Sequence, residues 1–212
     1  MSQYEGLTDE KFPDNFGYTH RSLFFLSMTI SEILTISKTR RKTEELDFLN
    51  NFIFKKYNVS LMYTFTMEYC KLLESGTGNG NYAALYKLNR KVAYFKGKTY
   101  QKDFELVEKR IDKLINSDFH KYLRNLRDKT FAHTDKSEMG SSFNLPSFTD
   151  KQLKMALAHF NEMNSIHSLC AAHFQVEYII SLDDDSSDLF VERQAKYLKH
   201  YRETVKDDWD VD

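Results

Sequence analysis

The sequence predicts an all-α protein, on three observations. Only 7 glycines and 2 prolines occur among 212 residues, which leaves few of the tight turns that an all-β chain requires. Hydrophobic residues make up 41% of the chain and aromatic residues 15%, enough to bury a sizeable core at this length. Apolar residues also recur at helical spacings of three and four over long stretches. We therefore expect a helical bundle of one domain, residues 1–212, with a long pair of helices at its C-terminal end.

The chain begins with residues 1–17, where Pro13 and Gly17 accompany mixed polar and aromatic residues. We expect an irregular N-terminal arm there. A first helix is predicted for residues 18–38, because its apolar residues follow helical spacing. They include Leu23, Leu26, Ile30, Ile33 and Leu34.

The next helix is predicted for residues 43–74, where Thr43 and two glutamates form an acidic first turn that favours the helix dipole. The glycine-rich residues 75–81 are the clearest break in the chain. They lack the lysine and the preceding strand of a phosphate-binding loop, so a linker is expected. A short helix over residues 82–95 follows, and Gly97 is expected to end it.

The C-terminal half is predicted to form four more helices. Ser117 and Asp118 mark the break before the second of them, and Thr149 with Asp150 caps the third. The predicted spans are residues 102–116, 119–132, 151–182 and 188–205, followed by an acidic tail at residues 206–212.

Charge is unevenly spread along the chain. The net charge of −1 excludes a generic polyanion binder. Residues 85–130, however, hold 13 Lys/Arg against 6 Asp/Glu, a local balance of +7, so the remainder carries −8. We therefore expect one face of the protein to meet an anion.

The two cysteines, Cys70 and Cys170, lie in apolar helical contexts, which is typical of buried packing residues in a reducing compartment. The N-terminus lacks a signal-peptide pattern, and no run of about 18 apolar residues occurs, so we expect a cytoplasmic protein without a membrane span. His167, Cys170 and His173 invite a zinc interpretation, but His173 is rotated by about 120° from His167 on a helix. Packing is the favoured interpretation, and no metal or cofactor is expected.

The most informative stretch is residues 126–135, Leu-Arg-Asp-Lys-Thr-Phe-Ala-His-Thr-Asp. It places Arg127, Asp128 and His133 near the end of a predicted helix. Arginine can hold phosphate charge, and histidine exchanges a proton near neutral pH. These residues are therefore candidates for phosphodiester chemistry. The simpler alternative is a solvated helix end whose histidine meets the C-terminal dipole.

Arg127 and His133 are six residues apart, so on a straight α-helix they lie about 120° apart around the axis and about 9 Å apart along it. Their head groups then do not converge on one atom. Either the helix unwinds near His133, or a second copy of the chain supplies the missing partner. The second alternative points to a two-fold homodimer with a composite cleft.

Three more cations, Lys121, Arg124 and Lys129, give this segment a basic surface and are candidates for substrate binding. Asp128 lies four residues after Arg124, so an ion pair that orients the arginine is available. The opposite side of the helix is apolar, with Leu123 and Leu126.

Arg127, the polar Asp128, four intervening residues and His133, near the end of a helix in an all-α bundle, resemble the HEPN superfamily. The surrounding residues look like the abortive-infection branch of that superfamily, and Leu46 to Asn50 look similar to it more weakly. The resemblance covers about ten residues and the helical layout.

The resemblance implies a metal-independent endoribonuclease that acts as a homodimer. In such enzymes the RNA 2′-hydroxyl attacks the adjacent phosphate and leaves a 2′,3′-cyclic phosphate. His133 would be the general acid or base, Arg127 would stabilise phosphoryl charge, and Asp128 would orient the arginine or the hydroxyl. A toxin or antiviral defence effector, controlled by an antitoxin protein, is the implied setting.

One position departs from a subgroup of this superfamily. That subgroup carries a tyrosine two residues after the histidine, where an antitoxin modifies it, and here the residue is Asp135. This mode of control is therefore in doubt. The alternative function is a non-catalytic helical module that binds RNA or a protein through the same basic face.

Overall fold

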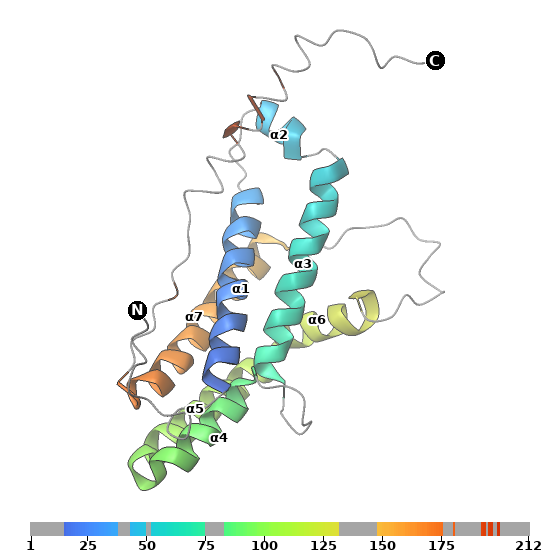
Figure 1. Cartoon of the computed structure of the whole chain (residues 1–212). Helices are drawn as coiled ribbons and strands as arrows, with labels where there is room; N and C mark the ends of the chain where they lie inside the picture. The colour runs from blue at the N-terminus through green and yellow to red at the C-terminus, as the bar shows by residue number, and fades with distance from the viewer. Residues whose placement is uncertain are drawn as a thin grey trace.

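The computed structural model describes residues 15–37, 43–49, 52–74, 83–131, 148–175 and 180, together with five positions between 192 and 199. Every regular element in these ranges is helical, which confirms the predicted all-α class (Figure 1). The α-helices are α1 (Asn15–Ile36), α2 (Thr43–Leu49), α3 (Phe52–Leu73), α4 (Leu85–Lys96), α5 (Gln101–Ile115), α6 (Asp118–Leu126) and α7 (Asp150–Ala172). Two short elements complete them, the 3₁₀-helix η2 (Gly97–Tyr100) and the π-helix η3 (Arg127–Phe131).

The main core lies where α1 packs between α3 and α7 (Figure 1). Leu26 and Ile30 of α1 are fully buried there, as are Phe65 of α3 and Phe160 of α7. Burying side chains of this size supplies the main driving force for folding, at about 1.5–3 kcal/mol each. The bundle that results is the platform against which the remaining helices pack.

Helix α1 also buries small polar residues, which a purely apolar pattern does not predict. The Thr19 hydroxyl donates to the carbonyl oxygen of Asn15 at 2.8 Å and lies 3.1 Å from that of Ala83. The Thr29 hydroxyl donates within its own helix, to Phe25, at 2.9 Å. These bonds satisfy the hydroxyls, so burial does not leave them without a partner.

Helices α4 and α5 form a hairpin at one end of the bundle, shown in green at the foot of Figure 1. Gly97 ends α4 with a φ of 55°, a conformation that glycine adopts without strain. This confirms the predicted end of that helix. A second apolar cluster, which includes Phe16, Val92 and Phe174, joins the hairpin to α1 and α7.

Two predicted helices are shorter than expected. The predicted helix over residues 43–74 is described as α2 and α3, and Asn50 and Asn51 lie outside the described residues. The predicted helix over residues 151–182 stops at Ala172. The Gln175 N–H bonds to the carbonyl oxygen of Ala172, and Gln175 has a φ of 57°, which turns the chain out of the helix.

The ends of the chain differ from expectation or lie outside the described residues. The predicted irregular arm, residues 1–17, is helical from Asn15 onward, and its earlier part lies outside them. The acidic tail at residues 206–212 also lies outside, as does most of the second C-terminal helix. The five described positions of that helix are helical, namely Glu192, Arg193, Ala195, Lys196 and Lys199. None of the described helices combines the length and apolar character that spanning a bilayer requires.

Candidate functional site at the end of α6

Helix α6 begins at the predicted break and runs out to the side of α3 (Figure 1). The Ser117 hydroxyl caps it by accepting a hydrogen bond from the His120 N–H at 3.1 Å. Phe119 and Leu123 are buried against the bundle, whereas Lys121 and Arg124 are exposed. The apolar face therefore positions the helix, and its basic face is left for solvent or a ligand.

The predicted α-helix over residues 119–132 changes its hydrogen bonding at Arg127. It is α-helical through Leu126 and continues as the π-helix η3, Arg127–Phe131, in which bonds span one residue more. The wider turn keeps Arg127 packed beside the end of α3. The assumption of a straight α-helix through Arg127 is therefore wrong. His133 lies outside the described residues, so its position relative to Arg127 stays a prediction.

Asp128 joins the two arginines of this segment. Its Oδ1 accepts a hydrogen bond from Arg127 Nε at 2.8 Å, and its Oδ2 lies 3.9 Å from Arg124 Nε. The predicted pair of Arg124 with Asp128 is present, but the closer contact is with Arg127. We call these three residues the Arg–Asp cluster. The carboxylate orients the Arg127 guanidinium group and leaves its Nη atoms without an acceptor among the described residues, whereas Arg124 lies at the outer limit of an ion pair.

Arg127 is partly buried and keeps its positive charge. Its side chain is 24% exposed, compared with 67% for Arg124. The hydrogen bond to Asp128 raises the Arg127 pKa, and the nearby carboxylate of Glu74 acts in the same direction. Below it, burial raises the pKa of the Cys70 thiol to about 11, so Cys70 is a protonated packing residue rather than a nucleophile.

A second histidine, His120, belongs to this site and was missed by the sequence reasoning. It lies four residues before Arg124 and seven before Arg127, a helical spacing that places all three on one side of α6. Its side chain is 7% exposed, and Nδ1 has no hydrogen-bond partner among the described residues. Burial lowers the His120 pKa to about 4, and the charges of Arg124 and Arg127 act in the same direction.

Tyr69 and His159 lie beside His120. The Tyr69 ring is buried and 5.8 Å from that of His120, and His159 is half-buried. The Tyr69 hydroxyl lies 2.7 Å from His159 Nδ1. Burial raises the pKa of Tyr69 and lowers that of His159. The phenol therefore keeps its proton near neutral pH and shares a hydrogen bond with a neutral imidazole.

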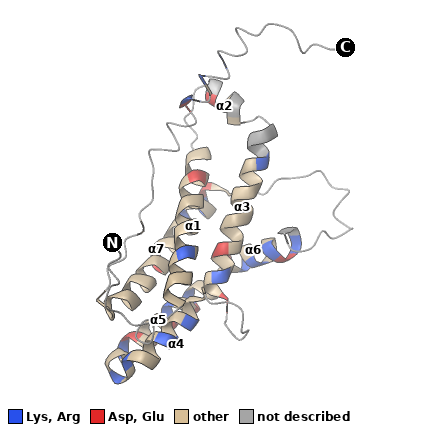
Figure 2. Cartoon of the chain, viewed as in Figure 1, with Lys and Arg blue, Asp and Glu red and all other residues tan. Residues whose placement is uncertain are grey.

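The remaining predicted substrate-binding residues lie on the outside of the segment. Lys121 is exposed, and its Nζ is 3.4 Å from Asp118 Oδ1. Lys129 is exposed on η3. Figure 2 marks the positions of basic residues along α6. These lysines are placed to hold a polyanion by charge without a defined geometry.

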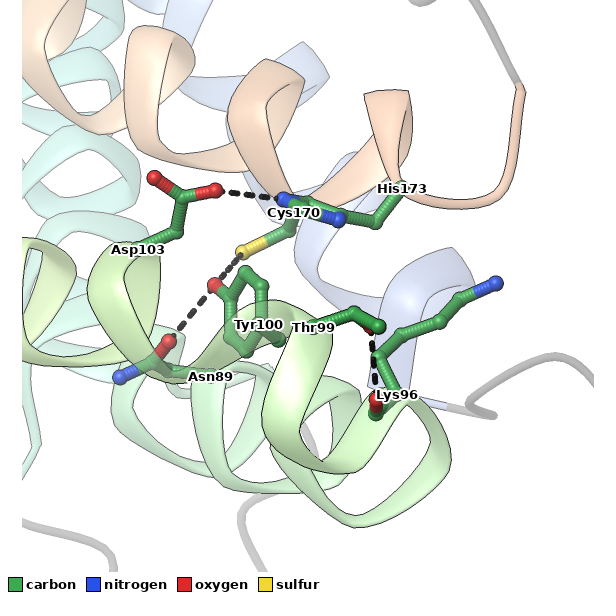
Figure 3. Close-up of polar contacts among 7 residues, drawn as sticks. All are labelled: Asn89, Lys96, Thr99, Tyr100, Asp103, Cys170 and His173. Atoms are coloured by element: carbon green, nitrogen blue, oxygen red, sulfur yellow. Dashed lines mark hydrogen bonds and ion pairs between the residues drawn. The ribbon is translucent and has the colours of Figure 1, made fainter.

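The residues considered for zinc do not converge. His167 is fully buried against Phe16, with ring centroids 4.2 Å apart. The Cys170 thiol contacts the Tyr100 hydroxyl at 3.3 Å, and His173 Nε2 lies 2.8 Å from Asp103 Oδ2 (Figure 3). The packing interpretation therefore describes them. Across the described residues, no group of three or more His, Cys, Asp or Glu side chains is placed to hold a metal ion.

Comparison with known proteins finds no match for the chain among protein-family models, curated proteins or solved structures.

Proposed function

We propose that this chain is a HEPN-like, metal-independent endoribonuclease. The observation that carries the proposal is the Arg–Asp cluster on a π-helical turn, directly before the segment that contains His133. Such turns occur frequently at functional sites. A partly buried carboxylate–arginine pair also costs conformational entropy that a simple solvated helix end would not require.

In the proposed reaction the 2′-hydroxyl oxygen of RNA forms a bond to the adjacent phosphorus, and the bond from phosphorus to the 5′-oxygen breaks. One proton leaves the 2′-hydroxyl and one reaches the departing 5′-oxygen. Arg127 is placed to stabilise the charge that develops on the phosphoryl oxygens, and Arg124 to bind the same phosphate or its neighbour. Asp128 acts as a positioning residue for both.

His133 is the proposed general acid or base, and His120 is not. An efficient proton carrier has a pKa near the working pH. The pKa of His120 is lowered to about 4, so it holds no proton to donate near neutral pH and is a weak base. His120 is instead a buried, neutral ring on the same helix as Arg124.

We propose a cytoplasmic toxin or antiviral effector that acts as a homodimer and is controlled by an antitoxin protein. The helical-angle argument for a composite cleft assumed a straight helix, and η3 removes that premise. The homodimer therefore follows from the resemblance alone. A native mass measurement tests it, and a strict monomer that cleaves RNA would contradict it.

The test of the proposed reaction is incubation of the purified protein with RNA in excess EDTA. We expect cleavage that leaves 2′,3′-cyclic phosphate ends, and a loss of about 100-fold or more in His133→Ala. An RNA with a single 2′-deoxy nucleotide should resist cleavage at that position alone. A requirement for a divalent metal, or full activity in His133→Ala, would contradict the mechanism. Binding without any cleavage would favour the non-catalytic module instead.

A further inference from the structure

The segment formed by α4 and η2 is basic throughout. Residues Leu85–Tyr100 contain five Lys/Arg and no Asp or Glu. Helix α5, which follows directly, has four residues of each sign. Figure 2 shows Lys and Arg positions along the ribbon of this hairpin, at the opposite end of α3 from α2. A run of cations without carboxylates is unusual for a merely solvated helix, where both signs are normally mixed.

The basic residues lie opposite the buried face of α4. Its buried side faces the bundle and consists of Leu85, Leu88, Asn89 and Val92. The exposed side carries Arg90, Lys91, Tyr94 and, beyond the turn, Lys98. Spacings of three and four place Arg90 and Lys91 on the same side of α4 as Tyr94, and Lys98 follows the turn at Gly97. We call these four residues the α4–η2 face.

These cations are not neutralised by ion pairs. In the described part of the chain, no carboxylate lies within ion-pair distance of Arg90, Lys91 or Lys98. Arg90 instead lies over the Tyr86 ring, with its guanidinium carbon 4.4 Å from the ring centroid. Their charge is therefore available to an external anion.

Tyr94 is the most exposed large apolar residue of the described chain, at 82%. Its ring meets the Phe95 ring edge to face, with centroids 5.5 Å apart, which restrains it without covering its outer surface. An exposed aromatic ring among cations is the combination that holds single-stranded nucleic acid, because bases stack on the ring while phosphates meet the cations. Double-stranded nucleic acid does not offer its base faces for stacking.

Hydrogen bonds connect α4 and η2, the elements that carry this face (Figure 3). Tyr100 is fully buried, and its hydroxyl donates to Asn89 Oδ1 at 2.7 Å. The Thr99 hydroxyl donates to the Lys96 carbonyl oxygen at 2.7 Å and secures the turn. Binding on this face therefore costs little ordering of the backbone.

From these observations we infer that the α4–η2 face is a docking surface for single-stranded RNA, bound without sequence preference through the exposed Tyr94 ring and the cations Arg90, Lys91 and Lys98. The choice of RNA rests on the proposed function. Single-stranded DNA offers the same phosphates and stacking bases, so this face does not distinguish RNA from DNA. Only the proposed reaction at the Arg–Asp cluster, which uses the 2′-hydroxyl, requires RNA.

The test is fluorescence anisotropy with a labelled 2′-O-methyl oligouridylate of about 16 nucleotides, a length that spans the usual binding sites. This probe has no 2′-hydroxyl to attack, so it reports binding whether or not the chain is a ribonuclease. Tyr94→Ala should weaken binding at least about fivefold, the lower end for loss of one stacked base. The double variant Lys91→Gln/Lys98→Gln should reduce the slope of log affinity against log salt by about 1.4.

Matched controls are Tyr63→Ala, a half-exposed tyrosine of α3, and Lys109→Gln/Lys113→Gln on α5, where acidic residues are interspersed. Both should bind as the unaltered chain does. Binding unchanged by Tyr94→Ala, equal losses in the controls, or a preference for phosphatidylserine vesicles over the oligonucleotide would overturn the inference. Absence of cleavage with intact, Tyr94-dependent binding would instead overturn the proposed reaction and leave this inference standing.

Discussion

The Arg–Asp cluster and the α4–η2 face are both basic, but they hold their charges differently. In the cluster, Asp128 contacts Arg127 at 2.8 Å and Arg124 at 3.9 Å, next to the helix that carries the buried, neutral ring of His120. On the α4–η2 face, three cations lie on the same segment as one exposed aromatic ring, without a carboxylate partner among the described residues. In the cluster, the carboxylate orients the Arg127 guanidinium group but cancels part of the positive charge. On the α4–η2 face, the positive charge is retained, but no described carboxylate orients the cations.

This difference separates two tasks. Stabilising a transition state requires donors held in position before the reaction, because only preorganised charges act without reorganisation. Holding a flexible polyanion requires charge and stacking surface, and it tolerates mobile side chains. We therefore assign the chemistry to the Arg–Asp cluster and much of the affinity to the α4–η2 face.

The largest expected effect is on the cluster. Arg127→Gln should slow cleavage at saturating RNA by about 100-fold, since it removes a positioned donor to the phosphoryl oxygens. Arg127→Lys keeps the charge but loses the planar fork, so an intermediate rate is expected. Single-turnover assays on one labelled RNA measure both. If Arg127→Lys cleaved RNA as fast as the unaltered chain, charge would matter more than the position of the hydrogen-bond donors. That result would contradict the contrast between the cluster and the α4–η2 face.

The next effect concerns His120, whose ring lies beside that of Tyr69. Burial lowers the pKa of His120 from 6.5 to about 4, so the folded state favours the neutral ring. This contribution to stability is present above pH 6.5 and is lost as the pH falls toward 4. Between pH 7 and pH 5 it amounts to about 2 kcal/mol. Urea unfolding at both pH values should show a smaller pH dependence in His120→Gln than in the unaltered chain. An identical pH dependence in the two proteins would contradict a buried neutral His120.

The smallest effect concerns Tyr100, a fully buried residue of η2. Tyr100→Phe removes the hydroxyl that bonds to Asn89 and contacts Cys170, at a cost of about 1 kcal/mol in unfolding free energy. The cleavage rate at saturating RNA should not change, because the Arg–Asp cluster lies on other helices. Urea unfolding and the cleavage assay measure the two quantities. A loss of maximal rate would mean that the two regions are not separable.

Most of the helical layout could be predicted from local sequence, because its signals act over a few residues. Ser117 and Thr149 cap their helices as expected, and Gly97 ends α4. The end of α7 at Ala172 could not be predicted this way. Phe174 is drawn into the second apolar cluster with Phe16 and Val92, and that contact joins segments far apart in the chain.

The candidate site was predictable in its residue types but not in its geometry. The spacing of Arg124 and Asp128 indicated their ion pair, but the change to π-helical bonding at Arg127 has no signature in residue type. His120 was missed, although its spacing from Arg124 and Arg127 was visible. Its importance comes from burial against α3 and α7, which a single helix does not reveal.

The most direct test of this division of tasks is cleavage of one RNA, measured over a range of protein concentrations for Arg127→Gln and Tyr94→Ala. The account predicts that Arg127→Gln lowers the maximal rate and leaves the half-saturating concentration unchanged. Tyr94→Ala should raise the half-saturating concentration and leave the maximal rate unchanged. If both substitutions change the same parameter, or if neither changes the cleavage, the assignment of chemistry to one region and affinity to the other is contradicted.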